Sequence, residues 1–139
     1  MRWALAAAVA ALAAGTMIGS FVILDNGAVR WHHIIGLAIA IPALAMWVLA
    51  RRELGSSFAV LPEARRLVTT GIYSRIRHPV YIFGWLFIGG LLTFMGALPV
   101  LVLLVPLGLL QIWRARREER VLEAAFGDEY RRYRDTTWP

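Results

Sequence analysis

Long uncharged apolar runs alternate with short arginine-rich segments along the chain. The first two runs, residues 3–24 and 31–50, contain 22 and 20 residues, and a third, residues 79–113, contains 35 residues without a charge. A helix of about 20 apolar residues is long enough to cross the hydrocarbon core of a bilayer. Gly96 and Pro99 interrupt the third run near its middle. This run therefore predicts two closely paired helices joined by a very short turn.

The pattern predicts an all-α fold, an integral membrane bundle of four transmembrane helices at about residues 3–24, 31–50, 79–95 and 98–113. An amphipathic cytoplasmic C-terminal helix over residues 114–126 continues the fourth span, and Gly127 is placed to end it. The length predicts a single domain over residues 1–139.

The alanine-rich start of the chain also resembles a signal peptide, which leaves cleavage of the first span open. The apolar run continues through residues 21–24, however, and is longer than the usual hydrophobic region of about 7–15 residues. We therefore interpret it as a membrane span.

The composition supports a membrane protein. The chain is 59% hydrophobic and 17% charged, whereas soluble domains carry about 25% charged residues. Its mean hydropathy is +0.61. The absence of cysteine excludes a disulfide scaffold and a cysteine nucleophile. Cytosolic, secreted and disordered proteins are poor fits to this composition.

The arginines gather on one side of the predicted bundle. All 15 cationic residues are arginine, and they outnumber the 9 acidic ones. Residues 51–77 hold six arginines and residues 114–134 hold seven, while the loop before the second span holds only Arg30 and the turn at 96–99 holds none. The positive-inside rule then places both termini and the 51–78 loop in the cytoplasm of a bacterial-type inner or plasma membrane. The membrane surface explains arginines that flank apolar spans, so no nucleic-acid partner is predicted.

The segment that leads into the third span carries the first group of candidate residues. Pro79 suits the first turn of a helix, where exposed N–H groups bind anions. An anionic part of a ligand could dock there. Alternatively, Arg77 and His78 anchor lipid headgroups, and Tyr73 and Tyr81 belong to the aromatic belt.

The predicted helix after the fourth span carries two acidic residues beside its apolar stripe. At 100° per residue, Glu118 and Glu119 flank the stripe that contains Leu122, and Arg114 stands one turn before Glu118. The arginines at positions 116, 117 and 120 are predicted to lie on the opposite, solvated side. The alternative is ordinary i,i+4 ion pairing on a solvated helix.

Together these two segments resemble the isoprenylcysteine carboxyl methyltransferase and phospholipid methyltransferase family of integral membrane enzymes. The first motif comprises Gly71, Tyr73, Arg77, His78, Pro79 and Tyr81. The second comprises Glu118, Glu119, Leu122, Phe126, Gly127, Tyr130 and Tyr133. The resemblance covers roughly residues 54–134, with the motifs in the family's order across a helical hairpin.

The resemblance implies S-adenosylmethionine as cofactor and a membrane-embedded lipid or lipophilic small molecule, such as a prenylcysteine carboxylate or a phospholipid amine, as methyl acceptor. It implies a cofactor pocket lined by Leu67, Val68, Tyr73, His78, Pro79, Val80, Tyr81, Glu118 and Glu119. Arg114, placed towards the acceptor, and Glu118 are the catalytic candidates. Two departures stand out: Phe83 occupies a position where many relatives have glycine, with Gly84 following, and the chain has fewer spans than longer members.

The sequence also bears on other functions. No metal site is predicted, because the adjacent His32 and His33 point about 100° apart on a helix. The glycine-rich fingerprint of soluble nucleotide-binding folds is absent. An NADPH-dependent membrane reductase and a non-catalytic small lipid-binding membrane protein stay open. So does the oligomeric state, for which the pair Gly15 and Gly19 is a weak hint of helix association.

Overall fold

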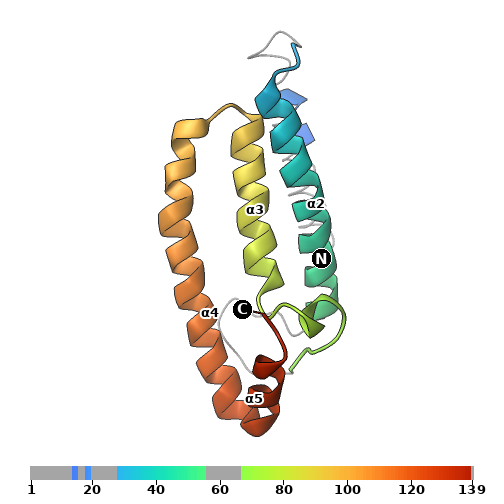
Figure 1. Ribbon diagram of the computed structural model, residues 1–139, viewed down its shortest axis with the longest axis vertical. Coiled ribbons are helices and arrows are strands. Elements are labelled where there is room, and N and C mark those ends of the chain that lie inside the picture. The colour runs from blue at the N-terminus through green and yellow to red at the C-terminus, as the bar shows by residue number, and fades with distance from the viewer. Residues whose placement is uncertain (1–13, 16–17, 20–27, 56–66, 139) are drawn as a thin grey trace.

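The computed structural model describes residues 14–15, 18–19, 28–55 and 67–138, and within these the chain is helical without a strand. The α-helices are α2 (Trp31–Leu54), α3 (Pro79–Phe94), α4 (Leu104–Phe126) and α5 (Asp128–Asp135), and two 3₁₀ helices are η2 (Gly71–Ser74) and η3 (Leu98–Leu103). Figure 1 shows α2, α3 and α4 as long, roughly parallel rods, with α5 folded beneath α4. The predicted first span, 3–24, lies almost entirely outside the described residues.

Local signals in the sequence set the helix ends. Pro79 occupies the first turn of α3, as predicted. Gly55, Gly96 and Gly127 follow helix ends with φ of 50°, 67° and 52°, a backbone conformation that glycine adopts without steric cost. α4 continues from the apolar run without a break and ends at Gly127, as expected. The residues after it form a separate helix, α5.

α2 and α3 form the tightest pair in the described part of the chain. Small residues permit this approach. A Cβ atom added to Gly90 would come within 2.7 Å of the backbone nitrogen of Ala40, and one added to Gly36 would meet the backbone of Phe94. Ala40 and Phe94 are 1% and 5% exposed. The backbones of α2 and α3 therefore touch at two levels.

α4 stands apart from this pair. It runs roughly alongside α3 but shares few contacts with it. The sequence predicted two closely paired helices joined by a very short turn; the turn is short, but α3 packs more closely on α2 than on α4. The apolar residues of α4 are mostly exposed, with 6% of its most apolar window buried. A large exposed apolar surface of this kind requires lipid or another apolar partner.

Two helical segments are long and apolar enough to cross a membrane, by length and composition. They are α2 and the continuous segment Leu98–Phe126, whose most apolar 18-residue stretches have mean hydropathies of 2.1 and 1.8. α3 is a shorter apolar helix of 16 residues.

The C-terminal segment is fastened to the loop that precedes α3. The Tyr133 hydroxyl donates a hydrogen bond of 2.7 Å to the carbonyl of Tyr73. Further along, the backbone N–H of Arg77 donates to the carbonyl of Trp138 at 2.9 Å, and the N–H of Trp138 donates to the carbonyl of Arg75 at 2.8 Å. Tyr130 of α5 is 1% exposed. These contacts fix the loop that presents Arg77 and the start of α3.

Candidate functional site

The start of α3 is built by η2 and by His78, which is the N-cap residue. The carbonyl of His78 accepts hydrogen bonds from the N–H groups of Tyr81 and Ile82, both at 3.1 Å. The N–H groups of Tyr81 and Ile82, which were expected to be available to an anion, therefore already have a hydrogen-bond partner. The His78 side chain is only 9% exposed and stacks on the Tyr81 ring, with ring centroids 5.7 Å apart.

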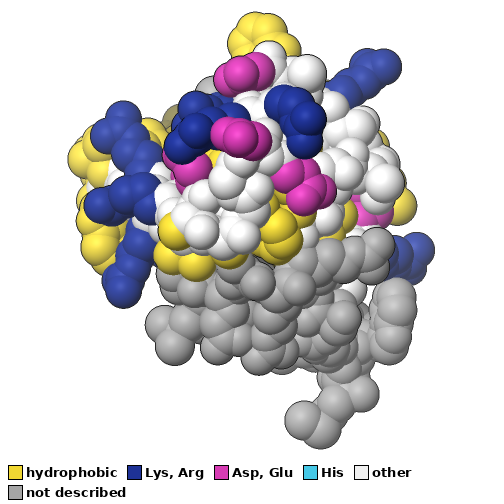
Figure 2. Space-filling model, turned by 90° about the horizontal axis from the view of Figure 1, so that it is seen from below, with side chains coloured by type: hydrophobic (Ala, Val, Ile, Leu, Met, Phe, Trp, Pro, Cys, Tyr) yellow, Lys and Arg dark blue, Asp and Glu magenta, His cyan; other side chains and the backbone are white. Residues whose placement is uncertain are grey.

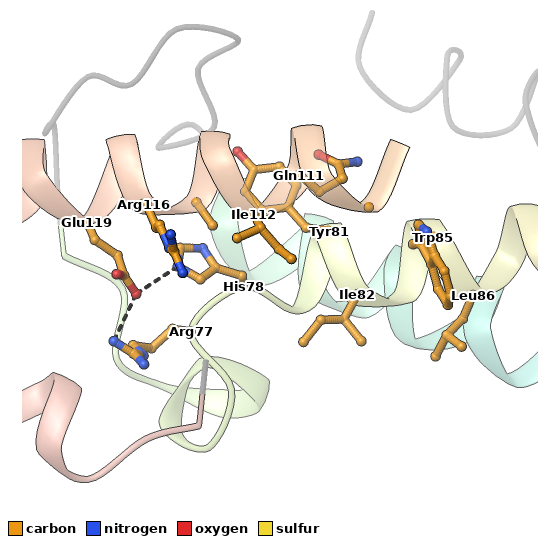
Figure 3. A pocket seen from close by; sticks show the side chains of 12 residues that line it. Arg77, His78, Tyr81, Ile82, Trp85, Leu86, Gln111, Ile112, Arg116 and Glu119 are labelled. Carbon is orange, nitrogen blue, oxygen red and sulfur yellow. Dashed lines mark hydrogen bonds and ion pairs between the residues drawn. The ribbon is translucent and has the colours of Figure 1, made fainter. Parts of the chain in front are cut away.

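Two carboxylates from α4 meet these side chains. Oε1 of Glu119 lies 3.2 Å from Nε2 of His78 and 2.8 Å from the guanidinium of Arg77. The Tyr81 hydroxyl donates to Oε2 of Glu118 at 3.1 Å, and the same oxygen lies 3.9 Å from Nδ1 of His78. Both ring nitrogens of His78 therefore face a carboxylate. Figure 3 shows the side chains of Arg77 and His78 both pointing towards the carboxylate of Glu119.

A cavity of about 570 Å³ opens between α3 and α4 next to this cluster. One end is polar and the rest is mostly apolar. Its lining residues are Arg77, His78, Tyr81, Ile82, Trp85, Leu86, Gly108, Gln111, Ile112, Ala115, Arg116 and Glu119. The view in Figure 3 shows the charged groups gathered at one end and Trp85 and Leu86 towards the other.

Helical periodicity explains this lining. On α3, positions 78, 81–82 and 85–86 share one face, and on α4 positions 108, 111–112, 115 and 119 do so. The Trp85 indole donates to the carbonyl of Leu104 at 2.9 Å and so links the two helices near the far end of the cavity. Gln111 adds a polar group to the wall, and its Oε1 atom is buried without a hydrogen-bond partner among the described residues.

The structure brings together four of the residues singled out from the sequence: His78, Tyr81, Glu118 and Glu119. Arg114 lies beside them, its Cζ atom 6.0 Å from the centre of the Tyr81 ring, although it does not line the cavity. Glu118 belongs to this cluster but does not line the cavity, and neither do the other residues predicted for the pocket. They are Leu67 and Val68 before η2, the buried Tyr73, and Pro79 and Val80 at the start of α3.

Burial also governs the tyrosines around the site. It raises the pKa of Tyr73 well above its ordinary value, and the negative charge of Glu118 adds to this shift. The pKa of Tyr130 rises to about 12, again because of burial and then of the nearby Glu119 charge. Both phenols therefore stay neutral at physiological pH.

Sequence reasoning missed several residues of the cavity. Arg77 was named in the first motif but given no role in the pocket, yet it pairs with Glu119 and lines the cavity. Arg116 was placed on the solvated side, and that placement was incomplete, because its side chain is exposed and also lines the cavity. Gln111 carries a signal that could have revealed it: it is the one amide side chain within residues 98–113.

The described residues contain no group of three or more side chains that could hold a metal ion. The two adjacent histidines have other contacts. Nδ1 of His33 accepts the backbone N–H of Arg30 at 3.0 Å, and Nδ1 of His32 lies 3.1 Å from the carbonyl of Phe94. They support the start of α2, at the other end of the helices from the carboxylates.

Comparison with known proteins adds a family to this geometry. No curated protein matches the chain significantly. The sequence model of a family described as phospholipid methyltransferase matches residues 31–129, which cover α2, α3, α4 and the start of α5. This match spans more than half of the chain and includes both carboxylates and the start of α3. The chain therefore belongs to the phospholipid methyltransferase family.

Proposed function

We propose that this membrane protein transfers a methyl group from S-adenosylmethionine to a lipophilic acceptor at the cytoplasmic membrane interface. The family is one of methyltransferases. The observation that carries the proposal is the cluster of Glu118, Glu119, His78 and Tyr81 at the polar end of an apolar cavity. A water-soluble cofactor and an apolar acceptor would meet at such a boundary.

The side chains present fit this cofactor. Its amino, hydroxyl and adenine N–H groups are hydrogen-bond donors, and Glu118 and Glu119 supply carboxylate acceptors with lone pairs beyond those already used. Its carboxylate matches the guanidinium group of Arg77. S-adenosylmethionine supplies a methyl group that is already activated on a sulfonium sulfur.

The residues of the chain therefore have to bind the cofactor and the acceptor, align them with each other, and exclude water. Tyr81 and His78 hold the two carboxylates in fixed orientations through their hydrogen bonds. Fixed alignment of two reactants can lower a reaction barrier by several kcal/mol, with an upper limit of about 7–11 kcal/mol. The walls formed by Ile82, Leu86 and Ile112 exclude water, which strengthens the electrostatic interactions in the site.

Arg114 is the residue that we assign to the acceptor. Its guanidinium lies against Tyr81, next to Glu118. A planar guanidinium binds a carboxylate or a phosphate through two hydrogen bonds, so a prenylcysteine carboxylate or a phospholipid headgroup suits it. We place both termini and this site in the cytoplasm because the described arginines of the two arginine-rich segments, at positions 51, 52, 75 and 77 and within 114–134, lie at this end of the helices.

The test measures cofactor binding and transfer separately. Purified protein in detergent is titrated with S-adenosylhomocysteine, and the Glu119→Gln variant, which keeps the side-chain size but loses its charge, is compared with it. We expect the affinity to fall about tenfold or more, since hydrogen bonds to charged groups contribute about 1.5–3 kcal/mol. The matched control is Glu129→Gln, at an exposed position of α5, which should bind normally.

Incubation with labelled S-adenosylmethionine and a total lipid extract then identifies the acceptor fraction. Tight NADPH binding without a response to S-adenosylhomocysteine would replace this proposal with a reductase. Unchanged affinity for every ligand in Glu119→Ala and His78→Ala would support a non-catalytic lipid-binding protein instead.

A further inference from the structure

We propose that Trp113, Arg116, Arg117 and Arg120 of α4 form a binding site for the phosphate group of an anionic phospholipid, at the edge of the cavity between α3 and α4. We call these four residues the headgroup site. The inference goes beyond the proposed function and holds whether or not methyl transfer takes place.

The first observation is an abrupt change of chemistry along the outer face of α4. Leu109, Leu110 and Trp113 are 64%, 50% and 53% exposed and do not line the cavity, so this face is apolar and lacks a protein partner within the described residues. One turn later the exposed side chains are arginines, at positions 116, 117 and 120. Exposed apolar residues favour contact with acyl chains, and exposed arginines favour contact with headgroups. The change marks the depth of the lipid phosphates.

The second observation is that these arginines form no ion pair with an acidic side chain among the described residues. The adjacent Glu118 and Glu119 turn towards α3 and bind Tyr81, His78 and Arg77 there. The next acid, Glu123, pairs with arginines of α5. Across the part of the chain that the structure describes, no ion pair involves Arg116, Arg117 or Arg120. Their positive charge is therefore available to an external anion.

The guanidinium groups are also held in place before any ligand arrives. Cζ of Arg117 lies 5.7 Å from the centre of the Trp113 ring, a cation–π contact. Nε of Arg120 donates to the carbonyl of Arg116 at 3.3 Å. Less side-chain freedom then has to be lost on binding, and the planar guanidinium donors match phosphate oxygens. In Figure 2, arginine side chains gather beside apolar ones on the α4 side of this end of the molecule.

The ligand is a lipid rather than a free phosphate because the same site has an apolar half. The Trp113 ring and the exposed apolar residues above it offer no hydrogen bonds to a dissolved anion, but they lie alongside acyl chains in a bilayer. Arg116 belongs to both the headgroup site and the lining of the cavity. A phospholipid held here therefore stands beside the route by which an apolar molecule enters from the membrane.

The experiment uses brominated lipids, which quench tryptophan fluorescence on contact. The full chain is placed in nanodiscs of phosphatidylcholine with a minority of brominated phosphatidylglycerol, and in matched discs where the brominated minority is phosphatidylcholine. The Trp113 contribution is the difference between the native chain and Trp113→Phe. Because one basic residue near an anionic membrane surface contributes roughly fivefold, we expect an approximately tenfold preference for phosphatidylglycerol at Trp113.

The double variant Arg117→Gln/Arg120→Gln should remove this preference, while Arg132→Gln, an exposed arginine of α5, should retain it. Raising the salt concentration should weaken the preference of the native chain, since exposed charges are screened. Equal quenching by both lipids in the native chain would overturn the proposal, and so would a preference that survives in the double variant. S-adenosylhomocysteine binding, measured on the same samples, reports on the proposed function independently.

Discussion

Arg77 and Glu119 form an ion pair of 2.8 Å that joins the loop before α3 to the middle of α4. Their side chains are only 12% and 25% exposed, so this contact is better protected from water than a surface pair. The same carboxylate oxygen lies 3.2 Å from His78. Arg77 therefore helps to fix the carboxylate that we assign to the cofactor.

Replacing Arg77 by Gln should weaken S-adenosylhomocysteine binding about tenfold, because Glu119 loses its charged partner and its fixed orientation. Arg77→Lys should recover part of the affinity, since it restores the charge but not the fork-shaped donor geometry. Arg75→Gln, at a neighbouring exposed position, is the control and should bind normally. Titration calorimetry in detergent measures all three. Native affinity in Arg77→Gln would contradict a role for this ion pair.

The backbone of Trp138, rather than its side chain, should be needed at the C-terminus. Its N–H donates to the carbonyl of Arg75 at 2.8 Å, while its side chain is 78% exposed. Trp138→Pro removes that donor and should cost about 1 kcal/mol of stability, together with part of the cofactor affinity. Trp138→Ala keeps the backbone bond and should behave like the native chain. Equal melting temperatures for the two variants would show that the bond is dispensable.

Close packing of α2 on α3 should make Gly90 intolerant of a side chain. A Cβ at this position would lie 2.7 Å from the backbone nitrogen of Ala40, so the helices would have to separate. We expect Gly90→Ala to lower the free energy of unfolding by about 1–3 kcal/mol, the usual cost of overpacking. At Gly84 the added Cβ would meet only the Trp47 side chain, at 3.4 Å. Gly84→Ala should therefore be neutral or stabilising in the same thermal-unfolding assay.

Alkaline pH should loosen the junction of α5 with the loop before α3. Burial raises the pKa of both Tyr130 and Tyr133 from 10.0 to about 12, which means that the fold favours the neutral phenols. Their contribution to stability is complete below the unfolded pKa of 10.0 and is lost as the pH rises through about 12. Tyr133→Phe should be less stable at neutral pH, since it loses the bond to Tyr73, but less sensitive to pH in this window. Identical pH slopes of the denaturation midpoint would contradict this account.

Helix ends were predictable from the sequence because they depend on neighbouring residues. Pro79 suits the first turn of a helix, where no backbone N–H is needed, and Gly127 follows the last turn of α4 with positive φ. The position of α4 was not predictable in this way. An apolar face can pack on another helix or on lipid. The periodicity of α3 therefore did not show that α3 would pack more closely on α2 than on α4.

The candidate site was predictable to the extent that it follows helical spacing. Glu118 and Glu119 face α3, on the side that the apolar stripe indicated. Arg116 is exposed as predicted but also reaches the cavity, because it stands three residues before Glu119 and side chains with that spacing are neighbours on a helix surface. Gln111 and Trp85 face each other across a cavity, and a cavity exists only once α3 and α4 have their relative positions.

The separation of α4 from the α2–α3 pair gives the protein two parts that can change independently under mutation. The tightly packed pair, with glycine against backbone, tolerates few substitutions. Little of the apolar window of α4 is buried, so residues that face the cavity, such as Ile112, can change in size with small losses of folding free energy. The side chains of α4 that line the cavity can therefore change while the packing of α2 on α3 stays intact.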